Sequence, residues 1–290
     1  MNAYQQFKNN LPHVDAREDF QISPYTTFKV GGVADVAVFP KTLDELRQSI
    51  LFLSQTMPYA VIGRGSNVLV SDKGFRGGVI FTSKLERMEL KSNVLIAEAG
   101  AKVKDVCNMA ITNNLSGIEF AVGIPGSIGG LVAMNGGCFN KCIADVVCYV
   151  IADGGVYNRA ACNFNYRYSR FLDGEIIHAV ALKLKVSEED VIAQKVERFT
   201  KTRLKNQPKG NSAGSIFLNQ GYFAGKLIDQ AGLKGYKIGG ASVSEKHGNF
   251  IINNGGTAQD IFELISYVKE TVFKKSNIKL VEEIRYIGEF

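Results

Sequence analysis

Residues 61–70 read VIGRGSNVLV, an apolar run that is interrupted by five small or polar residues and then resumes. Gly63 and Gly65 lie within three positions, and glycine alone reaches positive φ without a steric cost. The stretch predicts backbone that turns sharply or comes very close to a ligand. A dinucleotide is one candidate, because exposed loop N–H groups and the side chains of Ser66 and Asn67 could hold its phosphates. A glycine-rich turn between two strands is the plainer alternative.

This loop is not a Rossmann fingerprint. Val68 stands where that fingerprint requires a third glycine, and the residues after it read as strand rather than helix. Any phosphate site here must therefore be built without a helix N-terminus.

The composition is that of an ordinary globular chain large enough for two or three compact units. The 290 residues are 46% hydrophobic and 21% charged, and the net charge is +6. Lys and Arg are spread along the chain, so anionic small molecules explain the charge as well as nucleic acid does. No apolar stretch approaches the roughly 20 residues of a membrane helix. We expect a cytoplasmic protein with no membrane, nucleic-acid or obligate protein partner.

The cysteines and histidines suggest neither disulfides nor a metal. Five cysteines without a Cys-x-x-Cys pair fit neither a disulfide framework nor a zinc site. The three histidines lack the spacing of a helical or short-loop metal pair. His178 falls in a strand pattern over 175–186 that places alternate residues on one face, and we expect it to be packed rather than catalytic.

Short β-branched runs alternate with amphipathic helical patterns. Strand-like runs occupy 33–39, 59–65, 77–81, 93–100 and 278–288, and helical patterns begin at Thr42, Lys102, Ser187, Phe223 and Thr257. Thr42 with Glu45, and Thr257 with Asp260, have the spacing of capping boxes. The pattern predicts an α+β protein with units over 1–85, 86–190 and 191–290.

A second glycine-rich stretch, GIPGSIGGLVAMNGG at 123–137, strengthens the case for a ligand site. Its six glycines are more than a simple turn requires, and each costs conformational entropy on folding. We expect a ligand to lie against this backbone, and tight packing between elements is the alternative.

Taken together, the motifs of this sequence resemble those of the UDP-N-acetylenolpyruvoylglucosamine reductases of peptidoglycan synthesis, in their shorter class. Beyond the two glycine loops, the motifs that carry the resemblance are TTFKVGG (26–32), SDKGFRGGVI (71–80), YRYSRF (166–171), AGSIF (213–217), GGASVSEKHGNFIIN (239–253) and EEIRYIGE (282–289). The resemblance implies an FAD-dependent reductase that uses NADPH and a nucleotide-sugar substrate. It also implies two N-terminal FAD-binding subdomains of the vanillyl-alcohol-oxidase type and a C-terminal substrate domain.

The resemblance further implies which residues form the site. FAD is expected to contact Gly63, Arg64, Gly65, Ser66, Asn67, Gly123, Ile124, Pro125, Gly126, Ser127, Gly129, Gly130, Asn135 and Gly136. The substrate is expected to contact Tyr166, Arg203, Asn219, Lys246 and Arg285. Relatives that attach flavin covalently carry a His or Cys near the 63–67 loop, and this loop has neither, so we expect FAD to be dissociable.

Three residues are expected to carry the chemistry. Arg167 would pair with the substrate carboxylate and stabilise the enolate, Ser215 would donate the proton, and Glu283 would assist enolate stabilisation. Leu218 and Gln220 depart from the family pattern, which often has Lys and Pro there, so a cationic contact to the nucleotide is expected to be missing. Two alternatives remain: another FAD-dependent reaction on a hydroxy acid or lactone, and a nucleotide-binding module without catalysis.

Overall fold

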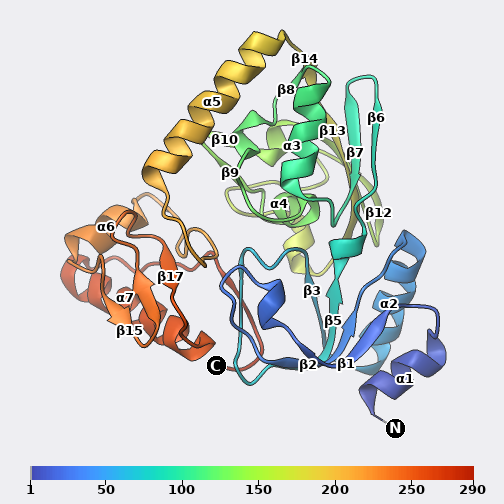
Figure 1. The fold of residues 1–290 in the computed structure, drawn as a ribbon, viewed down its shortest axis with the longest axis horizontal. Coiled ribbons are helices and arrows are strands. Elements are labelled where there is room, and N and C mark those ends of the chain that lie inside the picture. Colours follow the sequence, from blue (N-terminus) through green and yellow to red (C-terminus); the bar gives the residue numbers. More distant parts are fainter. Residues whose placement is uncertain (1) are drawn as a thin grey trace.

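The N-terminal part of the chain forms a four-stranded sheet flanked by two helices (Figure 1). The computed structural model describes residues 2–290. The strands, in order across the sheet, are β1 (Ala16–Gln21), β2 (Val33–Val38), β5 (Phe75–Phe81) and β3 (Tyr59–Ile62). Strand β5 runs parallel to both of its neighbours, whereas β1 is antiparallel to β2. Helices α1 (Ala3–Asn10) and α2 (Leu43–Thr56) share one buried apolar cluster with this sheet.

The middle part contains a five-stranded antiparallel sheet. Its strands, in order, are β12 (Gly155–Asn158), β11 (Val147–Ala152), β13 (Ile177–Lys183), β7 (Val94–Glu98) and β6 (Met88–Lys91). Helices α3 (Val103–Thr112) and α4 (Ile128–Ala133) pack their apolar residues into the core of this part. Two short strand pairs complete it: β8 (Leu115–Ser116) with β14 (Lys185–Val186), and β9 (Gly137–Cys138) with β10 (Lys141–Cys142).

A long helix, α5 (Glu189–Asn206), leads from the middle part to the C-terminal part (Figure 1). There, α6 (Ala224–Gln230) and α7 (Ala258–Ser276) pack with a three-stranded sheet in a separate core. The strands of this sheet are β15 (Lys237–Ile238), β16 (Ala241–Val243) and β17 (Ile251–Asn253).

The last residues of the chain return to the N-terminal part. Strand β18 (Arg285–Ile287) pairs in parallel with β4 (Val68–Val70), which directly follows the glycine loop at 63–67. The strand is shorter than the expected 278–288, because the residues before it bond to a different neighbour: the Leu218 N–H donates to the Val281 carbonyl at 2.8 Å. One short segment thus contacts two units of the protein.

Of the two expected capping boxes, one is complete. The side chains of Thr257 and Asp260 each accept the backbone N–H of the other at the start of α7. Thr42 accepts the Glu45 N–H at 3.1 Å, but the Glu45 carboxylate accepts from the Lys41 N–H instead of returning to Thr42. The second box is therefore only half formed.

Strand β13 is buried on both faces, because small Ala179 and Ala181 are covered opposite Val180 and Leu182. One further expectation needs correction. Helix α5 begins at Glu189 and not at 187, since the N–H of residue 187 still bonds to the Asn114 carbonyl beside the β8–β14 pair.

His178 is packed, as expected. Its side chain is fully buried, and its Nε2 lies 2.6 Å from Oδ1 of Asp153. Within residues 2–290, the five cysteines are free thiols and no helix is both long and apolar enough to cross a membrane.

Candidate active site

A cavity of about 1210 Å³ is lined by residues from all three parts of the chain. Its lining includes both glycine-rich loops, Arg167, the segment around Ser215, and Glu283 to Ile287. Typical small-molecule sites have volumes of roughly 300–1,000 Å³. The cavity is therefore large enough for a dinucleotide together with part of a second ligand.

The first glycine loop presents unused hydrogen-bond donors to this cavity. Across residues 2–290, no acceptor is bonded to the backbone N–H groups of residues 64–67. Gly65 has φ of +61°, and a Cβ there would lie 2.2 Å from the Tyr25 carbonyl oxygen. A row of free N–H groups on such a turn is the arrangement that binds phosphate oxygens, so this loop fits the pyrophosphate of FAD.

The two glycine loops also contact each other. A Cβ on Gly63 would lie 2.2 Å from the Ser127 hydroxyl, and a Cβ on Gly126 would lie 2.8 Å from the Ser66 hydroxyl. At these two positions the glycines serve tight packing between the loops, which was the alternative to a ligand site.

Two residues expected to contact FAD have other partners. The Arg64 guanidinium donates to the carbonyls of Ser83 and Gly100 and pairs with Glu86, so it links the N-terminal and middle parts. Asn135 is buried and does not line the cavity.

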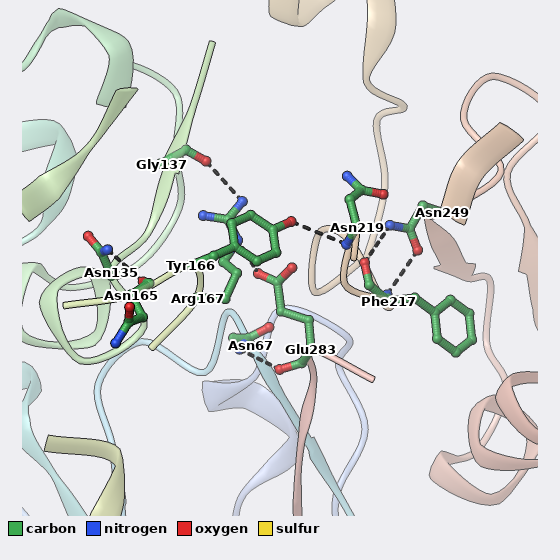
Figure 2. A network of polar contacts seen from close by, with 10 residues as sticks. All are labelled: Asn67, Asn135, Gly137, Asn165, Tyr166, Arg167, Phe217, Asn219, Asn249 and Glu283. Carbon is green, nitrogen blue, oxygen red and sulfur yellow. Dashed lines mark hydrogen bonds and ion pairs between the residues drawn. The ribbon is translucent and has the colours of Figure 1, made fainter. Parts of the chain in front are cut away.

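Asn135 instead supports the turn that carries Arg167 (Figure 2). Its Nδ2 donates to the Asn165 carbonyl at 2.8 Å, and its Oδ1 accepts the Ala144 N–H at 3.2 Å. Asn165 and Tyr168 exchange two backbone hydrogen bonds, which leaves residues 166 and 167 at the tip of a tight turn.

Arg167 occupies the position of this turn where glycine is usual. Its φ is +54°, and a left-handed conformation at a non-glycine residue costs about 1–3 kcal/mol. Its Nη2 donates to the Gly137 carbonyl at 3.0 Å. The surroundings hold the arginine in this strained conformation, and the guanidinium consequently lies in the cavity wall.

Residues 278–288, called the closing segment below, lie near the end of the chain and in part line this cavity. Glu283 of the closing segment forms an ion pair with Arg167 of the middle part. Nε of Arg167 lies 3.0 Å from Oε1 of Glu283, and the two side chains are 21% and 13% exposed. The contact is not an aligned hydrogen bond, since Nε has no acceptor in line with its N–H. Burial raises the pKa of Glu283, and the neighbouring arginine offsets that effect only in part.

Ser215 lines the large cavity and also a smaller hollow of about 320 Å³. No group within residues 2–290 is hydrogen-bonded to its hydroxyl. The Glu283 N–H donates to the carbonyl of the next residue, Ile216, at 2.7 Å, so the chain segments that carry Ser215 and Glu283 lie side by side. Arg167, Ser215 and Glu283 therefore share one cavity although they are far apart in the sequence.

Four of the five residues expected to contact substrate are divided between the two hollows. Arg203 and Arg285 line the large cavity, whereas Asn219 and Lys246 line the smaller one. Tyr166 lines neither, and its hydroxyl accepts the Asn219 N–H at 3.2 Å.

Several of these side chains already have protein partners. Arg203 donates to the carbonyls of Phe120 and Val122, and Lys246 donates to the Leu204 carbonyl at 2.5 Å. The Asn219 side chain accepts the Ala224 N–H at the start of α6.

Lys226, Lys234 and Cys138 also line the two hollows, and no sequence motif predicted them as site residues. Lys226 and Lys234 line the smaller hollow beside Lys246. Their sequence context is that of solvated helix and turn residues, and only their convergence marks them. Cys138 lines the large cavity and accepts a hydrogen bond from Arg203, and burial raises the pKa of its thiol despite that arginine.

The matches to known families define an FAD-binding protein with an added C-terminal domain. Residues 34–156 match the family described as FAD binding domain, and residues 206–287 match UDP-N-acetylenolpyruvoylglucosamine reductase, C-terminal domain. The predicted fold class is thereby confirmed, and FAD is the cofactor.

Full-length relatives define the family. The chain is 42% identical to the UDP-N-acetylenolpyruvoylglucosamine reductase of Clostridium botulinum (strain Okra / Type B1), over 100% of this chain and 99% of the relative. It is 41% identical to that of Clostridium kluyveri (strain NBRC 12016), over 100% of both. The crystal structure of the Thermus caldophilus enzyme superposes with a TM-score of 0.82 at 35% identity, over 95% of this chain and 99% of that one. The chain belongs to the UDP-N-acetylenolpyruvoylglucosamine reductase family.

Contact between the glycine loops should control FAD affinity. Alanine at position 63 would place Cβ 2.2 Å from the Ser127 hydroxyl, so either that hydroxyl must leave the Gly130 N–H it caps or the loops must separate. We expect Gly63→Ala to weaken FAD binding by about tenfold, or about 1.4 kcal/mol, in a fluorescence titration of the apoprotein. Adding Ser127→Ala removes the clashing oxygen and should restore part of the affinity. Unchanged affinity in Gly63→Ala would contradict this account.

The raised pKa of Glu283 should appear in the pH dependence of stability. Between its ordinary value of 4.5 and its raised value, the folded protein binds more protons than the unfolded chain. Stability must therefore fall as pH rises through that interval. The side chain of Glu283→Gln cannot titrate. The thermal midpoint of this variant, minus that of the wild type, should therefore increase as pH rises from 4.5 to 7. Parallel midpoint curves would show that the Glu283 pKa is not raised.

Proposed function

We propose that this protein reduces the enolpyruvyl ether of UDP-N-acetylenolpyruvoylglucosamine to UDP-N-acetylmuramate, with NADPH as the source of hydride. The reaction serves peptidoglycan synthesis in the cytoplasm. We further propose that units 1–85 and 86–190 bind FAD and that unit 191–290 binds the nucleotide sugar. The observation that carries the proposal is the convergence of Arg167, Ser215 and Glu283 on the cavity that also contains both glycine loops.

The reaction adds a hydride and a proton across a carbon–carbon double bond. Held against the two glycine loops, FAD would supply the hydride chemistry between NADPH and the terminal carbon of the enolpyruvyl group. Negative charge then develops beside the substrate carboxylate, and a preorganised cation is needed there. The protein must also provide one proton donor beside the adjacent carbon.

Arg167 suits the first task. Its guanidinium is permanently charged, planar and able to hold a carboxylate through two N–H groups. Its strained backbone and its bond to the Gly137 carbonyl fix it in the cavity wall before substrate arrives. Glu283 lies against it at 3.0 Å and would orient the guanidinium and assist stabilisation of the enolate.

Ser215 suits the second task. Its hydroxyl is free of protein acceptors within residues 2–290 and lines the cavity, so it can donate toward a bound ligand. A hydroxyl is a weak acid in water, but the carbanion-like intermediate is basic enough to take its proton. The carbon that becomes protonated would lie next to Ser215.

The smaller hollow suits the diphosphate of the substrate. It adjoins Ser215 and brings together Lys226, Lys234 and Lys246. Lys234 pairs with Asp229 of the same hollow at 2.7 Å, so the net positive charge comes from Lys226 and Lys246, which can replace the cation expected to be missing at Leu218. Burial lowers the pKa of His247 in the same hollow, so this ring adds no charge at neutral pH.

FAD should be released by denaturation. The 63–67 loop contains no His or Cys, and the Cys138 thiol in the cavity wall donates to the Phe120 carbonyl and keeps a raised pKa. We expect acid precipitation of the purified protein to leave a yellow supernatant. Flavin that stays with the pellet would show a covalent bond.

Replacement of Ser215 should separate the two half-reactions. In Ser215→Ala, NADPH should reduce the flavin at the wild-type rate, because that step needs no proton from the serine. Reoxidation by the enolpyruvyl nucleotide should slow by about 10²–10⁴-fold, as measured by stopped-flow absorbance. Ser212→Ala, which alters another serine of the same cavity, should reoxidise normally. Normal reoxidation in Ser215→Ala would exclude its role as the proton donor.

A further inference from the structure

The side-chain amide of Asn249 forms two hydrogen bonds with the backbone of Phe217 (Figure 2). Its Nδ2 donates to the Phe217 carbonyl at 2.8 Å, and its Oδ1 accepts the Phe217 N–H at 2.9 Å. Its own carbonyl accepts the Ile216 N–H at 2.9 Å. The side chain is 2% exposed. The asparagine therefore acts as a strand neighbour for the two residues that follow Ser215.

These bonds fix the Ser215 segment from one side, and the closing segment fixes it from the other. Ser215 forms an isolated bridge with Phe250, the residue after Asn249. The Ile216 carbonyl accepts the Glu283 N–H at 2.7 Å on the opposite side. Since no other group within residues 2–290 holds the Ser215 hydroxyl, its direction depends on this backbone.

We propose that Asn249 is a positioning residue that aims the Ser215 hydroxyl at the substrate carbon. The inference rests on the proposed role of Ser215 as proton donor. A buried amide with both of its groups satisfied holds a backbone more rigidly than a single hydrogen bond can. Misplacement of a reacting group by about 1 Å can cost about a hundredfold in rate.

Asn253 provides a matched control in the same part of the fold. It is also buried, at 3% exposed, and its amide also bonds two backbone groups: Nδ2 donates to Phe28 and Oδ1 accepts from Gly256. Asn253 lines neither hollow, whereas Asn249 lines the smaller one. Substitution of Asn253 should lower the free energy of unfolding about as much as substitution of Asn249, without changing the Ser215 segment.

Asn249→Asp keeps the shape of the side chain but places an oxygen against the Phe217 carbonyl. In stopped-flow experiments on the holoenzyme, NADPH should still reduce the flavin within about twofold of the wild-type rate, whereas reoxidation by the enolpyruvyl nucleotide should slow by about a hundredfold. Asn253→Asp should lower the thermal midpoint similarly and leave both rates within about twofold. Equal slowing of both half-reactions in Asn249→Asp would overturn the proposal.

A double-mutant cycle tests whether Asn249 acts through Ser215. In a Ser215→Ala background, Asn249→Asp should cost less than about threefold more in reoxidation rate, because residues that act as a unit are not additive. A full additional hundredfold loss would overturn the proposal.

A second variant, Asn249→Ser, tests the proposal if Asn249→Asp fails to fold. If Asn249→Asp does not retain FAD, Asn249→Ser removes the amide without introducing an oxygen that repels the Phe217 carbonyl, and the same cycle applies. Wild-type flavin that the enolpyruvyl nucleotide cannot reoxidise would overturn the proposed function itself. Additive losses would overturn only the role of Asn249.

Discussion

The closing segment of the chain is the constraint on which the rest of the site depends. Through β18 it pairs with the strand after the first glycine loop, and through Glu283 and Glu282 it bonds to the segment after Ser215. The Glu283 carboxylate also pairs with Arg167 of the middle part. One segment thus holds the strand after the first glycine loop, the serine segment and the arginine in fixed relation, and it forms part of the cavity wall.

The site is built from locally unfavourable choices that distant contacts sustain. Arg167 has a left-handed backbone, and Glu283 is buried enough for its pKa to rise. Neither would persist in an isolated peptide. Asn135 holds the arginine turn, and Asn249 holds the serine segment. Buried asparagines suit this purpose because one amide both donates and accepts, so it can replace a missing neighbour of a strand or turn.

Sequence reasoning identified the elements and the cavity walls better than it identified individual contacts. The cap of α7 could be predicted because Thr257 and Asp260 lie three residues apart and bond within one turn. The resemblance implies that Arg64 and Asn135 contact FAD, and the structure shows that their side chains also bond partners 9 to 36 residues away. Sequence spacing does not encode such partners.

The sequence by itself determined the family, the two glycine loops and the three residues now proposed for catalysis, since motifs and turn glycines act over a few neighbouring positions. Only the tertiary structure decided which glycines serve packing between the loops, which lysines converge beside Ser215, and which asparagines hold the turn of Arg167 and the segment after Ser215. The physical reason is that these depend on hydrogen bonds and steric contacts between segments joined by long loops, whose meeting is set by the packing of three separate cores.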